Sequence, residues 1–329
     1  MRAYITTSHE FYHPHYDYSD GEPFPFMDTP ERMLTILAGV RAAGIEVSEI
    51  TPEDHSATLF ALHDREYVQA LEEASAAIPE AIEWAPPGAM LVDEHSVVVP
   101  ENPVWEYAGD RGTPLMPETC AAARDAFNAV CTVASRLPES GRDLAVFTRP
   151  PGHHAGRARF AGMCFFNNCA GAATILGRHG RVAVLDLDYH LGDGVLDYAG
   201  ENLPYLSVHA ATETSYPNRE FPASEHPHAR LAGLAPGAGI PEYLEALDFL
   251  LGEARAFAPD YLVVLVGFDF IATDYMQDQP MNIAPPEAAR IAKRVARFPA
   301  RKLFVQEGGY DLATLADTAR HFFGAVVAA

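Results

Sequence analysis

Two neighbouring histidines and a later aspartate–histidine pair are the residues of this sequence whose types and spacing fit hydrolytic chemistry. His153 and His154 lie in the segment PPGHHAG, and Asp188 and His190 lie in DLDYHLGDG. Residues two positions apart in an extended segment face the same way, so Asp188 and His190 can reach one ion. Asp269 follows a later apolar run and can supply a third ligand. One nitrogen and two carboxylates leave room for water and substrate, as at catalytic zinc sites.

This set of ligands would accept more than one divalent metal. Zinc suits it, but Fe²⁺ or Co²⁺ can also bind mixed nitrogen and oxygen ligands. An isolated Asp-x-Asp-x-His would more often cap the loop after a strand than bind a metal. Here the histidine pair and the segment EGGY at 307–310 occur in the same chain. Together they favour a metal site.

The elements that must position these residues alternate between strand and helix. Apolar runs predict buried strands at 3–6, 144–147, 181–187, 205–208, 261–266 and 302–305. Capping residues and helical periodicity predict helices at 30–43, 64–74, 117–137, 168–179, 241–257 and 287–296, with a last helix after Asp311. This alternation is typical of an α/β fold with a parallel sheet covered on both faces. The chemical residues follow strand ends, where open α/β sheets hold their ligands.

Length and charge narrow the classes of function. The chain has 329 residues, 48% of them hydrophobic, and no low-complexity linker, so we predict a single domain over 1–329. The formal net charge is −22, from 45 acidic and 23 basic residues. That excess of negative charge disfavours nucleic acid or an anionic membrane as partner. It suits a cationic substrate, although many soluble proteins are simply acidic.

The cysteines and the N-terminal segment indicate a reducing compartment. Cys120, Cys131, Cys164 and Cys169 show no CxxC pairing and have apolar neighbours, which predicts buried thiols. The first residues contain no apolar signal core, and the longest apolar run, 261–268, is too short to span a bilayer. We therefore expect a soluble, cytoplasmic protein.

Five ordered segments of the sequence resemble the histone deacetylase superfamily. They read PGHHA, GMCFFNN, DLDYHLGDG, GFD and EGGY. Within that superfamily the chain is most similar to the bacterial acetylpolyamine amidohydrolases, and the resemblance covers nearly all of it. It implies the arginase/deacetylase fold, with a central eight-stranded parallel sheet and helices on both faces.

The resemblance also implies catalytic roles. Water bound to zinc would attack the substrate carbonyl. His154 would act as general base and then as general acid, with His153 as its electrostatic partner. Asp186 would orient His153, and Asp193 would orient His154, because a carboxylate partner fixes the tautomer of an imidazole. Tyr310 would donate a hydrogen bond to the developing oxyanion.

A structural potassium ion is a further implication of the resemblance. Asp186, the Ser207 hydroxyl and the carbonyl of Val208 would hold it, together with the carbonyls of Asp188 and His190. Hard oxygen ligands suit such an ion. A second potassium site is doubtful, because the connection that would hold it is shorter than the family pattern.

The substrate tunnel departs from the family pattern. The carbonyl of Gly162 would accept the scissile N–H. Met163 stands where an aromatic wall is usual, which makes the wall softer. Tyr216 or Phe221 could supply the other aromatic side, and the sequence does not decide between them. Glu101 matches one of two acidic positions that receive distal ammonium groups in acetylpolyamine enzymes.

The second acidic position falls on Gly112, with Glu106 and Asp110 as nearby substitutes. These carboxylates could equally form a solvated loop face. They belong to a long proline-rich segment at 85–118, which exceeds the usual loop length and is therefore a candidate functional or assembly element. In the same branch of the family this loop builds a dimer that narrows the active site, so we expect a homodimer.

These observations predict a zinc-dependent amidohydrolase that removes acetyl from acetylated primary amines, such as acetylpolyamines or similar small cationic amides. A protein acetyl-lysine deacetylase is the alternative enzyme. A more distant alternative is a non-catalytic binder of acetylated amines. An arginase-type ureohydrolase would need additional Asp and His ligands that bridge two metals, and the sequence does not offer them.

Overall fold

A parallel eight-stranded sheet forms the centre of the computed structural model, which describes residues 1–329 except 20, 91–93 and 100. The strand order is β10-β9-β8-β11-β12-β7-β1-β4, and all neighbours pair in parallel. The strands are β1 (Arg2–Ile5), β4 (Val47–Glu49), β7 (Leu144–Phe147), β8 (Val182–Asp186), β9 (Tyr205–Ala210), β10 (Ala229–Leu234), β11 (Tyr261–Val266) and β12 (Arg301–Gln306). The predicted sheet is confirmed.

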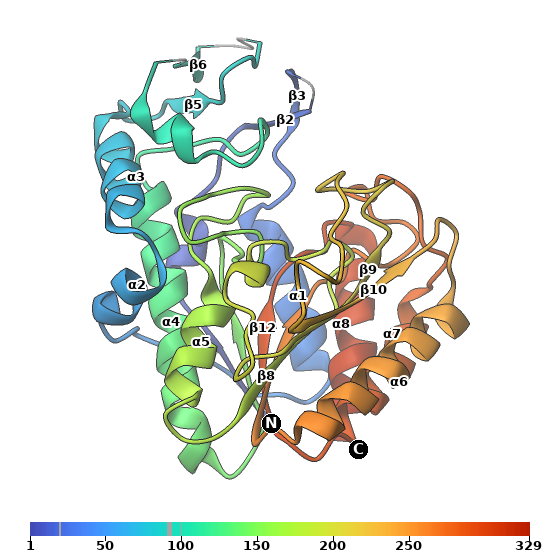
Figure 1. Ribbon diagram of the computed structural model, residues 1–329. Helices are drawn as coiled ribbons and strands as arrows, with labels where there is room; N and C mark the ends of the chain where they lie inside the picture. Colours follow the sequence, from blue (N-terminus) through green and yellow to red (C-terminus); the bar gives the residue numbers. More distant parts are fainter. Residues whose placement is uncertain (20, 91–93, 100) are drawn as a thin grey trace.

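Helices cover both faces of the sheet (Figure 1). One face packs against α1 (Pro30–Ala42), α6 (Ile240–Phe257), α7 (Ala288–Ala296) and α8 (Leu312–Val327). The other packs against α2 (Ser56–Leu62), α3 (Arg65–Ala77), α4 (Thr119–Ser140) and α5 (Asn168–Leu176). Side chains of β11 alternate between the two cores, since Val264 belongs to the first and Val263 to the second. This is the period of two expected for a strand buried on both faces.

Several elements differ from the sequence prediction. The edge strands β4 and β10 and the helix α2 were not expected, because their sequences are short, polar or interrupted by glycine. The segments expected as loops contain two small sheets, β2 (Tyr16–Ser19) with β3 (Glu22–Pro25), and β5 (Glu83–Ala85) with β6 (Ser96–Val98). They also contain the 3₁₀ helices η1 (Thr7–Glu10) and η2 (Pro103–Tyr107); η3 (Val195–Asp197) and η4 (Pro285–Glu287) lie later in the chain.

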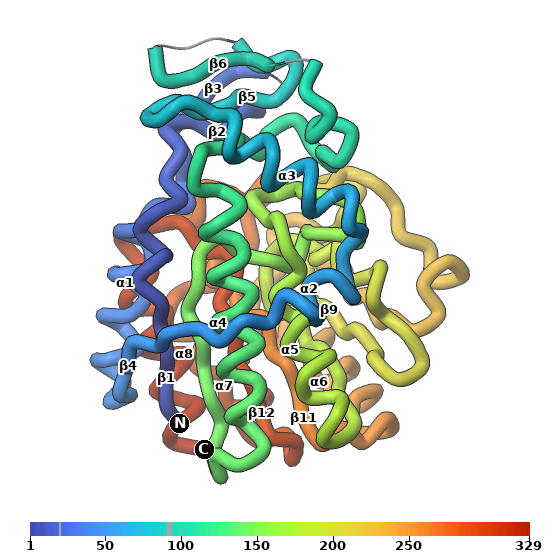
Figure 2. The backbone as a smooth tube through the Cα atoms, turned by 90° about the vertical axis from the view of Figure 1, so that its left-hand side faces the viewer, coloured from blue at the N-terminus to red at the C-terminus, as the bar shows by residue number. Residues whose placement is uncertain are grey.

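The two small sheets lie side by side at the same end of the molecule, as the dark blue and teal segments of Figures 1 and 2 show. Buried Glu83 links them, because it accepts hydrogen bonds from the backbone N–H of His15 (2.5 Å) and from Ser96 Oγ (3.1 Å). Met90 N also donates to Gly21 O (2.9 Å). The N-terminal hairpin, which consists of β2 and β3, is therefore held by hydrogen bonds to the long loop at 85–118 and the residues just before it.

The order of the central strands decides which loops meet. β8, β11, β12 and β7 are consecutive neighbours, so the loops after their carboxyl ends converge. These four loops carry the histidine pair, the Asp-x-His segment, Asp269 and the EGGY segment. All four cysteines are buried free thiols, as predicted. Within the described residues, no helix is both long and apolar enough to cross a membrane.

Candidate active site

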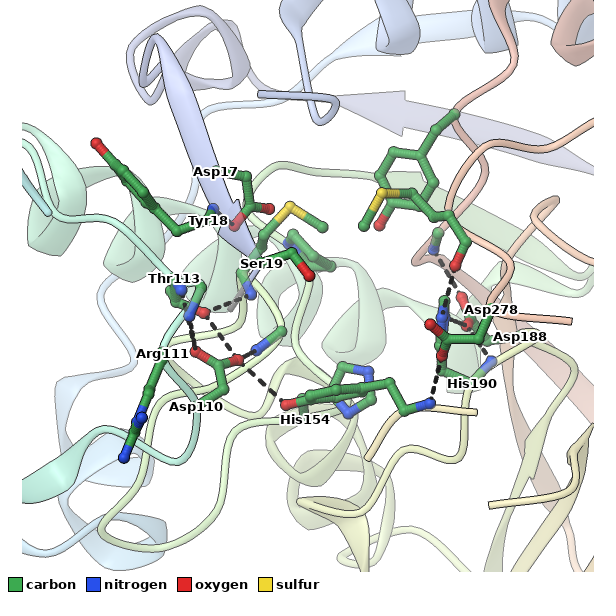
Figure 3. A pocket seen from close by; sticks show the side chains of 18 of the residues that line it. Asp17, Tyr18, Ser19, Asp110, Arg111, Thr113, His154, Asp188, His190 and Asp278 are labelled. Atoms are coloured by element: carbon green, nitrogen blue, oxygen red, sulfur yellow. Dashed lines mark hydrogen bonds and ion pairs between the residues drawn. The ribbon is translucent and has the colours of Figure 1, made fainter. Parts of the chain in front are cut away.

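A pocket opens at the carboxyl edge of the sheet, beneath the N-terminal hairpin and the long loop (Figure 3). It has a volume of about 290 Å³. Most residues that the sequence predicted for chemistry lie in its wall. The lining includes His153, His154, Gly162, Met163, Asp188, His190, Tyr216 and Tyr310.

The structure brings together Asp188, His190 and Asp269. One ligand atom from each lies within 4.8 Å of the others. His190 Nδ1 is 3.1 Å from Asp269 Oδ2 and 3.4 Å from Asp188 Oδ1. Both carboxylates are buried. Burial, together with the charge of Asp188, raises the pKa of Asp269 to about 7. Two carboxylates held this close out of water fit a site that is completed by a cation.

The orientation of His190 also fits a metal ligand. His190 Nε2 lies 3.2 Å from the carbonyl oxygen of Met276, which can only accept a hydrogen bond, so Nε2 carries a proton. Burial would lower the pKa of His190, but the hydrogen bonds and charges of Asp188 and Asp269 outweigh it and raise that pKa. A positive charge is therefore favoured between these side chains, and a metal ion bound to Nδ1 of the neutral ring would supply it. A second hydrogen bond that fixes the ring in this way is the usual companion of a metal-bound histidine.

The adjacent histidines His153 and His154 both line the pocket. Their ring centroids are 4.1 Å apart. His153 Nδ1 lies 3.1 Å from Asp186 Oδ2, and His154 Nδ1 lies 2.9 Å from Asp193 Oδ1. Each carboxylate therefore stands behind the imidazole that the sequence analysis gave it, and it leaves the Nε2 atom of that ring for the pocket side.

The two histidines have opposite protonation tendencies. Burial would lower the pKa of His153, but the carboxylates of Asp188 and Asp186 outweigh it and raise that pKa to about 10. Burial and the charge of His153 lower the pKa of His154 to about 4. The hydrogen bond and the charge of Asp193 raise the pKa of His154 but do not outweigh these two effects. Asp193 Oδ2 also accepts from Arg159 (2.7 Å) and Arg219 (3.1 Å). Near neutral pH, His154 is the ring able to take up a proton.

Tyr310 is held from several sides. Its backbone N–H donates to Asp274 Oδ2 (2.6 Å). Arg32, which is fully buried, donates to the carbonyls of Glu307 and Gly309 and lies over the Tyr310 ring at 4.8 Å from the centroid. Sequence reasoning missed these supports, because Arg32 and Asp274 lie far from the EGGY segment in the chain.

A buried carboxylate connects the Tyr310 support to the histidine loop. Asp28 Oδ1 accepts from Arg32 Nη1 (2.9 Å) and from Arg149 Nε (2.7 Å), and all three side chains are fully buried. Arg149 directly precedes the PPGHH segment. Burial would raise the pKa of Asp28, but the two guanidinium groups outweigh it and lower that pKa. The ion pairs of Asp28 therefore stabilise the folded protein at neutral pH. This stabilisation is lost as the pH falls through the lowered pKa of Asp28.

We expect Asp28→Asn to lower the free energy of unfolding by about 3–5 kcal/mol, because two buried cations lose their shared counter-ion. Urea denaturation at neutral pH measures this change. The control is Asp248→Asn, which breaks a surface pair with Arg294 (3.1 Å) and should cost less than about 1 kcal/mol. Equal losses in the two variants would contradict the role given to Asp28.

The predicted substrate residues divide into two groups. Gly162, Met163 and Tyr216 line the pocket. Gly162 and Met163 have positive φ angles of 52° and 63°, and a Cβ on Gly162 would lie 2.4 Å from His154 Cδ2. Phe221 and Glu101 are not part of this lining; the Phe221 ring instead packs against His226 and Arg219.

Asp110 joins the long loop to the tunnel wall. Its Oδ1 accepts from the backbone N–H groups of Gly112 and Thr113, both at 3.0 Å. Its Oδ2 accepts from Thr113 Oγ1 (3.1 Å), Gly162 N (2.5 Å) and Tyr216 Oη (3.1 Å). The sequence offered this residue as one possible acceptor of a substrate ammonium. In the structure its oxygens already accept five donors from the protein.

The residues predicted to hold potassium also lie together. Asp186 on β8 pairs with Ser207 on β9, next to Val208. Ser207 Oγ lies 2.9 Å from His209 Nδ1, and Tyr205 Oη donates to Asp186 Oδ2 (2.7 Å). The hydroxyl and carboxylate chemistry fits a hard monovalent cation.

Sequence and structure comparisons agree with this geometry. The profile of the histone deacetylase domain matches residues 27–326. The chain belongs to the histone deacetylase family. An acetylpolyamine amidohydrolase of Burkholderia pseudomallei is 30% identical to it, over 98% of both chains. The crystal structure of an acetylpolyamine aminohydrolase from the same organism superposes with a TM-score of 0.87 at 28% identity, covering 100% of this chain and 99% of the other.

A second solved structure shares the fold at a lower sequence identity. The HD domain of HDA15 superposes with a TM-score of 0.79 at 20% identity, covering 100% of this chain and 91% of the other. The arginase/deacetylase fold predicted from the sequence is therefore confirmed.

Proposed function

We propose that this protein is a zinc-dependent amidohydrolase that removes acetyl groups from acetylated primary amines, with small cationic amides such as acetylpolyamines as its substrates. The observation that carries the proposal is the convergence of the Asp-His-Asp set, the carboxylate-backed histidine pair and Tyr310 on one pocket. The similarity to acetylpolyamine amidohydrolases over nearly the full length of the chain supports this substrate class.

The metal ligands in this proposal are Asp188, His190 and Asp269. A zinc ion held there supplies Lewis acidity toward the substrate carbonyl and lowers the pKa of a bound water. His154 takes the proton from the attacking water and later gives it to the leaving amine. His153, held by Asp186, supplies positive charge beside the reacting atoms.

The remaining residues position the substrate and stabilise charge. The phenol O–H of Tyr310 donates a hydrogen bond to the oxyanion. This needs little reorganisation, because Arg32 and Asp274 already hold the residue in place. The carbonyl of Gly162 accepts the scissile N–H. Met163 and Tyr216 form two sides of the tunnel; of the two aromatic candidates, Tyr216 has the supporting geometry because its ring lies 4.9 Å from that of His154.

The proposal also covers the extent of the domain, the cellular location, the oligomeric state and a potassium site. We propose one deacetylase domain over 1–329, working in the cytoplasm as a homodimer in which the segment 85–118 rims the active site. Asp186, Ser207 and Val208 hold a structural potassium ion. The four free, buried cysteines support the cytoplasmic location, because thiols persist in a reducing compartment.

The test is a turnover assay on metal-quantified protein, with N-acetylputrescine in one arm and an acetyl-lysine peptide in the other, each with and without a chelator. We expect faster release of acetate from N-acetylputrescine, and a fall to background when the metal is removed. Faster release from the peptide would favour a protein acetyl-lysine deacetylase. Turnover that survives removal of the metal would contradict the proposed mechanism.

A further inference from the structure

The carboxylate behind His154 is held on its other side by an arginine. Asp193 Oδ1 accepts a hydrogen bond from His154 Nδ1 (2.9 Å), and Asp193 Oδ2 accepts one from Arg159 Nη1 (2.7 Å). The side chain of Asp193 is fully buried, whereas that of Arg159 is 25% exposed. The three side chains therefore form one line of hydrogen bonds that runs from the pocket toward the surface.

Arg159 compensates the charge of this buried carboxylate. Burial would raise the pKa of Asp193, but the hydrogen bond and charge of His154, together with the charge and hydrogen bond of Arg159, outweigh it and lower that pKa to about 2. A buried anion is costly unless donors reach its oxygens. Arg159 supplies a donor for the oxygen that His154 does not reach, and it remains charged while the imidazole is neutral.

The backbone and the long loop fix the path of the Arg159 side chain. Gly156 N donates to Arg159 O (3.0 Å), which closes a tight turn. The next residue, Phe160, exchanges backbone hydrogen bonds with Tyr107 (3.0 Å) and Gly109 (2.7 Å). The stem of Arg159 passes directly over Gly109, where a Cβ would lie 2.6 Å from Arg159 Cδ. The guanidinium group therefore has little freedom to leave the carboxylate.

Two neighbouring arginines are placed differently. Arg219 Nη2 also donates to Asp193 Oδ2 (3.1 Å), but 54% of its side chain is exposed, so water screens this pair. Arg157 lies two residues before Arg159 in the same segment, and its guanidinium donates to two backbone carbonyl oxygens instead. The geometry thus selects Arg159 as the principal partner of Asp193 and offers Arg157 as a matched control.

We propose that Arg159 is a positioning residue of the active site, and that it holds the Asp193 carboxylate in the orientation in which Oδ1 faces Nδ1 of His154. This inference rests on the proposed function, in which His154 moves the proton. Arg159 does not line the pocket, so it acts on the reaction only through Asp193. Without the guanidinium, the carboxylate can rotate toward other donors, and the imidazole loses the partner that fixes its tautomer.

The first experiment compares Arg159→Met with the wild type, both loaded with zinc, on N-acetylputrescine. Methionine keeps an apolar stem over Gly109 but has no donor for Asp193. We expect kcat to fall about 10- to 100-fold, the usual worth of one hydrogen bond to a charged group. KM should change less than about threefold, because Arg159 does not line the pocket. Wild-type kcat in this variant would overturn the proposal.

Conservative replacement and chemical rescue separate positioning from a loss of folding. Arg159→Lys keeps one charged donor and should lose less kcat than Arg159→Met. Methylguanidinium, added at millimolar concentration to Arg159→Ala, should raise kcat at least about threefold, because it restores the missing donor group. The same addition should leave the wild type unchanged. An Arg159→Lys variant as slow as Arg159→Met, with no rescue of Arg159→Ala, would mean that the arginine is only structural.

A double-mutant cycle tests whether Arg159 acts through Asp193. Asp193→Asn should lower kcat by itself, and in that background Arg159→Met should lower it by less than about a further twofold. Arg157→Met removes the same charge from the same segment and should keep kcat within about threefold of the wild type. Fully additive losses in the cycle, or equal losses in Arg157→Met and Arg159→Met, would contradict the proposal.

A measurement without turnover distinguishes failure of this inference from failure of the proposed function. The Nδ1 proton that His154 shares with Asp193 gives a downfield proton NMR resonance, which its loss in His154→Ala identifies. In zinc-loaded Arg159→Met this resonance should shift or broaden, whereas in Arg157→Met it should keep its position. If the wild type hydrolyses no acetylated amine, the proposed function is wrong, and this resonance still decides the role of Arg159. An unchanged resonance in Arg159→Met overturns the inference even when the wild type is fully active.

Discussion

Replacing His154 with alanine is expected to lower kcat by about 100- to 10,000-fold, the range usual for a general acid–base group. The structure gives the reason. His154 is buried, its Nδ1 is 2.9 Å from Asp193, and its pKa is lowered to about 4 by burial and by the charge of His153. The ring is therefore neutral near pH 7 and can accept a proton. Activity should fall as pH decreases toward that pKa, because protonation removes the base.

The measurement is kcat for N-acetylputrescine, with the metal content determined for each preparation. His228→Ala, at an exposed position, is the matched control and should keep wild-type kcat. The His154 variant should bind metal normally, because His154 is not among the proposed ligands. If His153→Ala lost far more activity than His154→Ala, the roles of the two rings would have to be exchanged.

Tyr310→Phe is expected to lower kcat by about 100- to 1,000-fold, as removal of one oxyanion donor usually does. The substitution deletes a single hydroxyl. Arg32 still packs over the ring, and Asp274 still accepts a hydrogen bond from the backbone N–H of the residue. The fold and the metal content should therefore stay unchanged, and KM should move much less than kcat. Tyr261→Phe is the matched control, because Tyr261 lies at the amino end of strand β11 and the pocket lies at the carboxyl ends of the strands.

Steady-state kinetics with metal analysis distinguish the possible outcomes for Tyr310→Phe. A raised KM with unchanged kcat would place Tyr310 in ground-state binding. Wild-type kcat in this variant would rule out its assignment to the oxyanion.

The central sheet and the grouping of Asp188, His190 and Asp269 could be predicted from the sequence because their signals are local. Continuous apolar runs such as 261–266 indicate strands buried on both faces, and polar residues that directly follow them indicate a site at the strand ends. The two-residue spacing of Asp188 and His190 predicted that both side chains face the same way, and the structure brings them together. The proposed roles of the individual residues in catalysis came from the resemblance of the five segments to the histone deacetylase superfamily.

The residues that shape the far end of the pocket could not be predicted, because long-range packing places them. Asp110 was offered by the sequence only as a possible acceptor of a substrate ammonium, whereas in the structure it accepts hydrogen bonds from the protein. Its role depends on which donors reach the carboxylate, and two of them come from Gly162 and Tyr216, far along the chain. The edge strands β4 and β10 escaped prediction for a related reason, since a strand with one neighbour needs less apolar sequence.

The shared carboxylate of Asp28 has a consequence for engineering this enzyme. Because Arg32 holds the segment that carries Tyr310, and Arg149 begins the segment that carries the histidine pair, neither catalytic loop can be exchanged by itself. A chimera that takes one of these loops from a relative would need positions 28, 32 and 149 from the same parent. Loop grafts that divide this set should yield insoluble or inactive protein even when every catalytic side chain is present.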